Sequence, residues 1–147
     1  MIGIVVDEIN NDPKSYVMFR ELNKISGRVP CFVFTNGIRG LPMKNEFTIL
    51  QQIEAMSHQG TLIGTSIMSS QIVAKSLTAR KKLLYMWDLE WSKLENFHAS
   101  QVQNLFLNKE LDVIARSDKH KEVFSKLYKN TDKVIYNWRA EELLKVI

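Results

Sequence analysis

The sequence predicts an α/β fold with a single, doubly wound and mainly parallel sheet of about six or seven strands. Three observations point to this class. Short β-rich apolar runs alternate with stretches of helical period along the chain. The run 83–87 is apolar on both faces, as a central parallel strand is. No repeat, low-complexity segment or linker interrupts the pattern, so we expect one α/β domain over residues 1–147.

In the first half of the chain, capping residues mark where the helices start and end. Residues 2–6 are apolar and predict the first strand. Asp12 followed by Pro13 predicts the start of a helix, because aspartate caps a helix and proline fits its first position. Gly27 ends this helix. The other elements expected here are strands over 30–34, 47–50 and 61–64, a loop over 36–42, and a brief helix that closes at Gly60.

In the second half, apolar residues at helical spacing predict which helix faces are buried. The helix that follows residue 64 is expected to bury Met68, Ile72, Val73 and Leu77. Ser117 caps a later helix, whose apolar stripe is Val123, Phe124, Leu127 and Tyr128. The remaining elements are strands over 83–87, 112–115 and 133–136, and helices over 101–107 and 139–146.

Composition places the chain among globular proteins. Apolar residues make up 45% and charged residues 24%, which excludes a disordered chain, a collagen-like repeat and a disulfide scaffold. The single cysteine, Cys31, lies in an apolar run and predicts a buried, reduced thiol. No apolar run reaches the ~18 residues of a membrane helix. The first residues lack a basic leader, so we expect a cytoplasmic protein that does not enter a membrane.

The net charge of +4 is mild, since 16 acidic residues are mixed among 20 basic ones. A dedicated nucleic-acid-binding domain shows a strong basic stripe instead. The densest basic clusters are 80–82 and 116–133, and most of their lysines are expected to be solvated faces of helices. Contact with a polyanion such as DNA therefore stays an open alternative that charge alone does not select.

Polar side chains follow nearly every predicted strand. Because the carboxyl ends of parallel strands meet at one edge of a sheet, these groups are expected to converge on one crevice. Helix capping is an alternative explanation for the serines and for the last asparagine among them. The candidate residues after the strands are Asp7, Asn36, Thr65, Ser66, Asp88, Arg116, Ser117 and Asn137.

The sharpest local feature is the segment Trp87-Asp88-Leu89-Glu90-Trp91. In an extended chain Asp88 and Glu90 lie on one face, and Trp87 and Trp91 on the other. Two carboxylates fit a general base and its partner, and tryptophans beside carboxylates suit sugar rings. The alternative is a pair of core tryptophans that bracket a solvent-facing turn. No histidine or third carboxylate stands at metal-ligand spacing, so no metal site is expected.

This segment follows the most apolar strand, so it is expected near the middle of the crevice. We expect Asp88 to be partly buried there. Its partner is expected to be a backbone N–H or a strand-end group such as Thr65, Ser66 or Arg116. We also expect at least one of Trp87 and Trp91 to pack into the core.

Several motifs are missing. Residues 7–12 are rich in carboxylates and replace the Gly-rich loop of dinucleotide-binding proteins, and they would also repel a flavin phosphate. No P-loop and no Gly-x-Ser-x-Gly is present. A receiver-type phosphoacceptor matches only in part. Arg116 and the helix start at Ser117 favour an anion, whereas His58 and His98 are expected at the surface and His120 in a packed position.

Two segments of the second half resemble a known family. Residues 111–117 (LDVIARS), followed by a helix and by residues 133–137 (KVIYN), resemble the end of the N-terminal Rossmann-like half of GT-B glycosyltransferases. Residues 82–88 are similar to the strand that delivers acceptor-side residues in that family, with Trp87 where histidine is common. The segment 87–91 also resembles glycosyltransferase-type proteins of T-even-like bacteriophages.

The resemblance implies a glycosyltransferase-like protein, either a minimal enzyme or the acceptor half of a split one. Asp88 and Glu90 would be the base and the ligand of the acceptor hydroxyl, and Arg116 with Ser117 would meet an anionic group. A nucleotide sugar is the one cofactor implied, and that family holds it chiefly in a second domain. We therefore expect a donor-domain partner chain or a homo-oligomer. The alternative is a non-catalytic binding or interaction module derived from such a half-domain.

Overall fold

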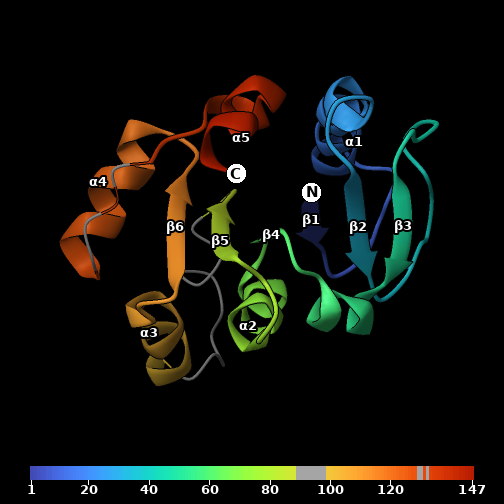
Figure 1. Ribbon diagram of the computed structural model, residues 1–147. Helices are drawn as coiled ribbons and strands as arrows, with labels where there is room; N and C mark the ends of the chain where they lie inside the picture. The colour runs from blue at the N-terminus through green and yellow to red at the C-terminus, as the bar shows by residue number, and fades with distance from the viewer. Residues whose placement is uncertain (89–98, 129–130, 132) are drawn as a thin grey trace.

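The strands of the computed structural model join one parallel sheet (Figure 1). The structure describes residues 1–88, 99–128, 131 and 133–147. In chain order the strands are β1 (Ile2–Val5), β2 (Cys31–Thr35), β3 (Thr48–Gln51), β4 (Thr61–Gly64), β5 (Lys81–Met86) and β6 (Leu111–Ala115).

The order of the strands across the sheet is β3-β2-β1-β4-β5-β6. This is the order of a doubly wound, Rossmann-like sheet, in which the chain builds outward from the centre in one direction and then in the other. The predicted fold class is therefore confirmed. β1 lies between β2 and β4, and all of its residues are buried.

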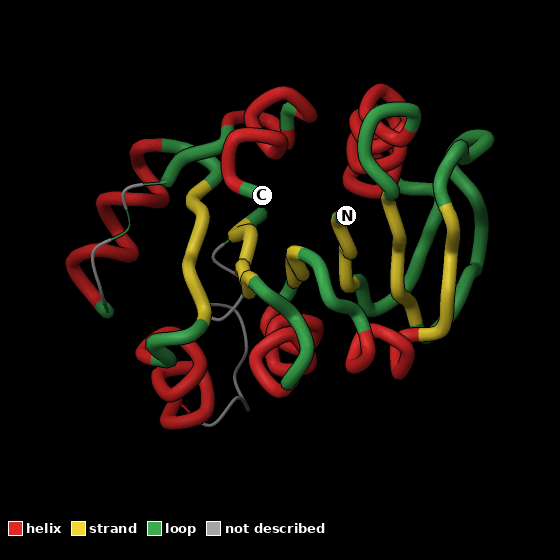
Figure 2. The backbone as a smooth tube through the Cα atoms, in the orientation of Figure 1, coloured by secondary structure: helices red, strands yellow, loops and turns green. Residues whose placement is uncertain are grey.

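Helices cover both faces of the sheet (Figures 1 and 2). α1 and α5 lie on one face, and η1, α2 and α3 lie on the other, while α4 lies beside β6. None of the described helices has the length and apolar character needed to cross a membrane. The helices are α1 (Pro13–Ser26), α2 (Ile67–Lys75), α3 (Ala99–Leu107), α4 (Asp118–Leu127) and α5 (Ala140–Val146), with 3-10 turns η1 (Gln52–Ser57) and η3 (Tyr136–Trp138).

Alternation along β1 divides the core into two layers. Ile2 and Ile4 face the layer of α1 and α5, whereas Val5 faces the layer of α2. Gly3 lies on the same face of β1 as Val5, and a Cβ there would lie 2.6 Å from a ring carbon of Phe34 and 2.7 Å from a methyl carbon of Leu62. Only glycine fits this position without displacing the core.

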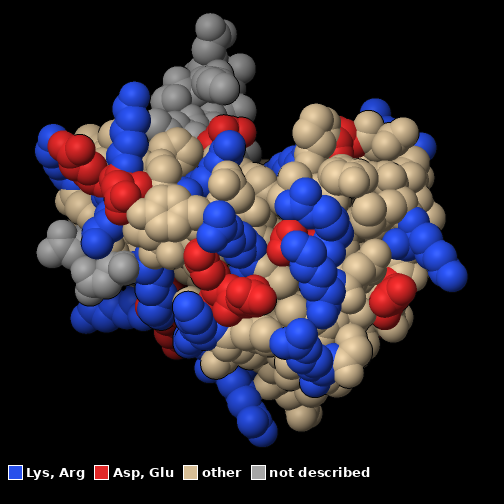
Figure 3. Space-filling view, turned by 90° about the horizontal axis from the view of Figure 1, so that it is seen from above, with Lys and Arg blue, Asp and Glu red and all other residues tan. Residues whose placement is uncertain are grey.

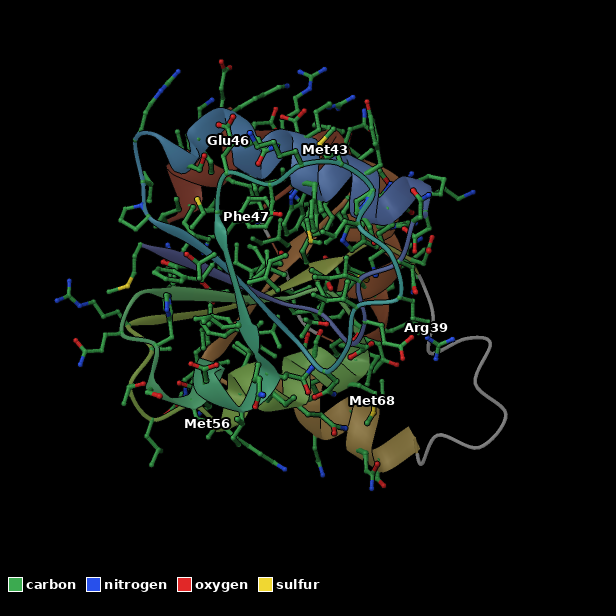
Figure 4. The ribbon with its side chains drawn as sticks, turned by 90° about the vertical axis from the view of Figure 1, so that its right-hand side faces the viewer. Arg39, Met43, Glu46, Phe47, Met56 and Met68 are labelled. Atoms are coloured by element: carbon green, nitrogen blue, oxygen red, sulfur yellow. The ribbon has the colours of Figure 1, made fainter. Side chains whose placement is uncertain are left out.

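The long connection between β2 and β3 is anchored by one aromatic side chain. Phe47 points inward from this connection toward α1 (Figure 4), where its ring meets the edge of Phe19 at 4.9 Å. The cap predicted at Asp12 is confirmed, because its side chain accepts a hydrogen bond from the Ser15 N–H at 2.7 Å. Cys31 is buried as expected, and burial raises the pKa of its thiol to about 11.

The buried face of α2 differs from the one that the apolar pattern predicts. Val73 is buried, but Met68 and Leu77 are 54% and 93% exposed. Ser70 faces the sheet instead. Its hydroxyl lies so near Gly64 on β4 that a Cβ at Gly64 would be 2.3 Å from it. The helix thus approaches β4 too closely for large side chains. On α4, Phe124 is buried as expected, whereas Leu127 is 61% exposed.

The strand predicted over 133–136 is wrong. Val134 forms a single parallel bridge with Ala115. Beyond it, Asn137 and Trp138 adopt left-handed conformations with φ of 53° and 56°, which turn the chain off the sheet. The buried Tyr85 hydroxyl then donates to the Ile135 carbonyl at 2.7 Å and accepts from the Trp138 N–H at 3.3 Å. These contacts fix the segment across the sheet rather than along its edge.

The prediction that His58 lies at the surface is also wrong, because its side chain is buried. Its ring meets Phe32 and Phe34 edge to face, with centroids 5.8 and 5.6 Å apart. Burial, together with the charge of the N-terminal amine, lowers the pKa of His58, against the opposing effect of a hydrogen bond with the backbone of Thr61. His58 is therefore a packed imidazole whose neutral form is favoured.

One buried carboxylate joins α1 to α5. Glu21 on α1 accepts the N–H of Ala140 at 3.1 Å and hydrogen bonds from Lys24 at 2.6 Å and Arg20 at 2.9 Å. Burial raises the pKa of Glu21, but these hydrogen bonds outweigh it and hold the pKa below its usual value of 4.5. A carboxyl of this kind stabilises the fold above its unfolded pKa, and the contribution disappears as the pH falls through the folded pKa.

We predict that Glu21→Gln lowers the free energy of unfolding at pH 7 by about 1–2 kcal/mol, because it weakens buried, charge-assisted hydrogen bonds. The difference from wild type should shrink as the pH falls from the usual pKa of 4.5 through the lowered pKa of the folded protein, where the wild-type carboxylate takes up a proton. Urea denaturation at pH 7 and at acid pH measures both effects. Glu122→Gln, which removes an exposed pair with Lys126 on α4, is the matched control. Equal effects of the two variants would contradict this role of Glu21.

Candidate functional site

The strand order creates a crevice between the carboxyl ends of β1 and β4. The chain leaves β1 toward β2 on one side, and later places β4 on the other side of β1, so the two connections diverge. Ligands of doubly wound sheets bind at such a switch point. Here the crevice is flanked by the loop 6–12 after β1 and by Thr65 after β4.

A pocket of about 290 Å³ occupies this position, and we call it the switch-point pocket. Its volume lies at the lower end of the range of about 300–1,000 Å³ that is typical of small-molecule sites, so it suits a ligand the size of one sugar ring. Nine residues from the β1–α1 connection, the first turns of α1 and the end of β4 line it: Val6, Asp7, Glu8, Asn10, Asp12, Lys14, Ser15, Met18 and Thr65.

The loop that forms one wall of the pocket is held by backbone pairing. Ile9 is fully buried, donates its N–H to the Gly37 carbonyl at 2.9 Å, and accepts the Arg39 N–H at 2.9 Å. The Asp7 carbonyl accepts the Asn36 N–H at 3.2 Å. The β1–α1 loop is therefore an extension of the parallel pairing between β1 and β2, and it presents its side chains from a fixed backbone.

The charged groups of the pocket are mainly carboxylates. Glu8 forms an ion pair with Arg39 at 2.9 Å, and Asp12 is engaged as the cap of α1. Lys14 donates to the Thr65 carbonyl at 3.2 Å. The Asp7 side chain is exposed, and its carboxylate has no partner among the residues that the structure describes. The pocket thus offers acceptor oxygens to a ligand that carries O–H donors, and it disfavours a phosphate.

Trp87 lies beside this pocket but belongs to the core. It is 8% exposed, and its ring stacks on Trp138 with centroids 5.5 Å apart and meets Tyr85 edge to face at 5.1 Å. Two cations approach the Trp87 ring, Lys14 at 5.8 Å and Arg116 at 5.9 Å from its centroid, within range of a cation–π interaction. The expectation that a tryptophan of this segment packs into the core is confirmed. Its burial leaves little ring for a sugar to stack on.

Asp88 differs from the expectation. Its side chain is 66% exposed, so the prediction of a partly buried carboxylate is wrong. The reason is that β5 ends at Met86 and the buried chain ends at Trp87, so that Asp88 is the first residue beyond the core and keeps its contact with water. The expected partner Arg116 is present, as an ion pair with Asp88 at 3.8 Å, and it also donates to the Trp87 carbonyl at 3.1 Å. Glu90 and Trp91 lie outside the described residues.

The other candidates have separate positions. Ser66 is buried and caps α2, and Ser117 caps α4 by accepting the His120 N–H at 3.3 Å, so the capping explanation holds for both serines. Asn36 is exposed and lines a different pocket, beside β3. Asn137 lies over α1 and α5. The structure thus brings Asp7 and Thr65 together in one pocket, and Trp87, Asp88 and Arg116 together beside it.

Lys14 is the residue that sequence reasoning missed, and it links these two groups. Its amine contacts Thr65 in the pocket and the face of Trp87 next to it. The signal in the sequence was the position of Lys14 in the first turn of α1, two residues after the capping Asp12. That turn sits at the carboxyl edge of a parallel sheet, because α1 runs back from the end of β1. Asn10 and Glu8, which also line the pocket, belong to the loop that replaces the Gly-rich turn.

Neither metal ligands among the described residues nor a known relative assigns a function to this site. Within residues 1–88, 99–128, 131 and 133–147, no group of three or more His, Cys, Asp or Glu side chains could hold a metal ion. No family model, no curated protein and no solved structure matches the chain.

We predict that Asp88→Asn changes the free energy of unfolding by less than about 1 kcal/mol, because the carboxylate is 66% exposed and lies 3.8 Å from Arg116, which keeps its hydrogen bond to the Trp87 carbonyl. Trp87→Ala should instead cost about 3–5 kcal/mol, as a truncated core aromatic does. Urea denaturation of both variants measures the contrast. A loss for Asp88→Asn as large as that for Trp87→Ala would show that Asp88 is structural.

Proposed function

We propose that this chain is the acceptor-side half of a glycosyltransferase, which binds a sugar or another polyhydroxylated acceptor in the switch-point pocket. The observation that carries the proposal is the Asp7 carboxylate, which is unpartnered among the described residues and is held by a fixed loop in a pocket at the topological switch point. A free carboxylate there is suited to accept hydrogen bonds from ligand hydroxyl groups. The resemblance of residues 111–117 to GT-B glycosyltransferases supports the same reading.

The general base of the proposed reaction is Asp88. β5 is the neighbour of β4, so Asp88 follows its strand at the same edge of the sheet as Thr65. Its carboxylate is open to a substrate hydroxyl, and Arg116 at 3.8 Å balances its charge. A base must reach the proton that it removes, which an exposed carboxylate at a strand end can do once an acceptor is bound. Glu90 is proposed as its partner on the basis of the sequence alone.

The donor is proposed to be a nucleotide sugar that a partner chain or a second copy holds. The switch-point pocket has three carboxylates and one amine, so it would repel the diphosphate of such a donor. If one half binds the acceptor and another binds the donor, the acceptor pocket can stay mainly acidic, and only the donor pocket needs cations for the diphosphate. Transfer would then take place where the donor-binding partner covers the carboxyl edge of the sheet.

A non-catalytic binding module is the second candidate function. It is favoured by the fact that the pocket residues Asp7, Lys14 and Thr65 form their arrangement without Asp88. In this case the chain would bind the same class of ligand and transfer nothing.

We predict that Asp7→Asn weakens the binding of a monosaccharide ligand about tenfold, since a hydrogen bond to a charged group contributes about 1.5–3 kcal/mol. Calorimetric titration with a panel of monosaccharides and of UDP- and GDP-sugars measures this. Asp112→Asn is the matched control, because Asp112 is an exposed carboxylate near the start of β6, paired with Lys133. Stability should not change with Asp7→Asn, as its side chain is exposed.

The outcomes of the panel separate the readings. Binding of monosaccharides alone supports the acceptor half, and transfer upon addition of a donor-binding partner distinguishes it from the non-catalytic module. Binding of a nucleotide sugar by the isolated chain that Asp7→Asn weakens would place the donor in the switch-point pocket, point to a minimal enzyme and contradict the division of donor and acceptor. A panel without binding, or an Asp7→Asn variant that binds as well as Asp112→Asn, would overturn the proposed site.

A further inference from the structure

A second and larger pocket lies on the helical layer, away from the residues of the switch-point pocket. It has a volume of about 670 Å³, and we call it the α1–α5 groove. It shares no lining residue with the switch-point pocket. Four basic and two acidic side chains take part in its lining, which consists of Arg20, Glu21, Lys24, Ile25, Arg28, Asn137, Arg139, Ala140 and Glu141.

The basic side chains of this groove come from two distant parts of the chain. Arg20 and Lys24 are four residues apart on α1 and therefore share a face, and the turn after α1 adds Arg28, whose N–H bonds to the Ile25 carbonyl at 2.9 Å. Arg139 comes from the segment before α5. Figure 3, which faces this layer, shows Lys and Arg side chains gathered over its middle, with acidic side chains among them.

The position of Arg139 is fixed by strained and buried neighbours. Asn137 and Trp138 have φ of 53° and 56°, which is unfavourable for a bulky residue such as tryptophan. On one side of Arg139, the Trp138 side chain is fully buried and stacked on Trp87. On the other side, the Ala140 N–H donates to the Glu21 carboxylate at 3.1 Å. The surrounding core therefore enforces this turn, and the turn brings Arg139 beside α1.

The two acidic groups leave part of the positive charge uncompensated. Arg20 and Lys24 both use Glu21, the buried carboxylate of the groove. Arg28 and Arg139 are exposed, and neither guanidinium has a partner among the residues that the structure describes. A guanidinium contacts phosphate oxygens through paired N–H donors, so two free guanidinium groups at one groove suit a phosphate ligand.

We propose that the α1–α5 groove binds a small ligand with a diphosphate group, which Arg28 and Arg139 contact directly. The volume of the groove falls within the range of about 300–1,000 Å³ for small-molecule sites, and this favours a compact ligand over a polymer laid on a flat surface. The inference stands apart from the proposed function, because the groove and the switch-point pocket have different residues and opposite charge.

Calorimetric titration of the full chain with pyrophosphate and with ADP tests this proposal. We expect both probes to bind, with affinity that falls between about 50 and 300 mM NaCl, as for charge-dominated binding. Arg28→Gln combined with Arg139→Gln should weaken binding at least about tenfold. The control Lys75→Gln combined with Arg80→Gln removes the same charge from exposed positions outside the groove and should leave the affinity within about twofold of wild type.

A conservative variant separates geometry from charge. Arg28→Lys with Arg139→Lys keeps the charge but loses the planar fork, and we expect an affinity between those of wild type and the glutamine variant. If the double glutamine variant does not fold, the two single variants are titrated instead. A further titration uses a single-stranded oligonucleotide. We expect the control variant Lys75→Gln with Arg80→Gln to bind it as the wild type does.

Three results would overturn the proposal. These are no binding of pyrophosphate or ADP at low salt, an equal loss of binding in the control variant, and oligonucleotide binding tighter than ADP binding that both variants weaken alike. The last result would mean diffuse attraction to a polyanion rather than a site. None of them bears on Asp7, so failure here is distinguishable from failure of the proposed function.

Discussion

β1 pairs with β2 on one side and with β4 on the other, and the positions of the remaining elements follow from this double pairing. Ile2 is opposite both Cys31 and Thr61, so the three central strands start in register. Each face of β1 must be covered by a helical layer, and Gly64 on the neighbouring β4 lets α2 approach the sheet closely. The connections leaving β1 and β4 diverge, which opens the switch-point pocket at the carboxyl edge.

The C-terminal segment depends on that sheet through a cluster of aromatic side chains. The Tyr85 hydroxyl is bonded to the segment on two sides, and burial raises its pKa to about 12, so it stays protonated as a donor. Trp138 closes the stack over Trp87, whose ring Lys14 and Arg116 also approach. The same cluster thus places α5 against α1, and the α1–α5 groove lies between these helices. It also joins the ends of β5 and β6 to the switch-point pocket. Trp87 therefore has a structural role, and Lys14 connects it to the switch-point pocket.

The parts of the fold that the sequence predicts are those determined locally. Apolar runs and capping residues such as Asp12 and Ser117 mark the six strands and most helices, because their signal lies within a few neighbouring residues. The seventh strand fails because a distant hydroxyl, that of Tyr85, competes for the Ile135 carbonyl. Lys14 was missed for the same reason, since its contact with Thr65 spans 51 residues and no local pattern signals it.

We propose the switch-point pocket as the binding site of a hydroxyl-rich ligand. The most direct measurement is a two-dimensional NMR titration of the whole chain with the monosaccharide panel. We expect amide chemical-shift changes that concentrate on the residues around the pocket, such as Asp7, Glu8, Lys14 and Thr65, and leave the amino ends of the strands unchanged. Shifts that occur elsewhere, or a spectrum that no sugar changes, would contradict the claim.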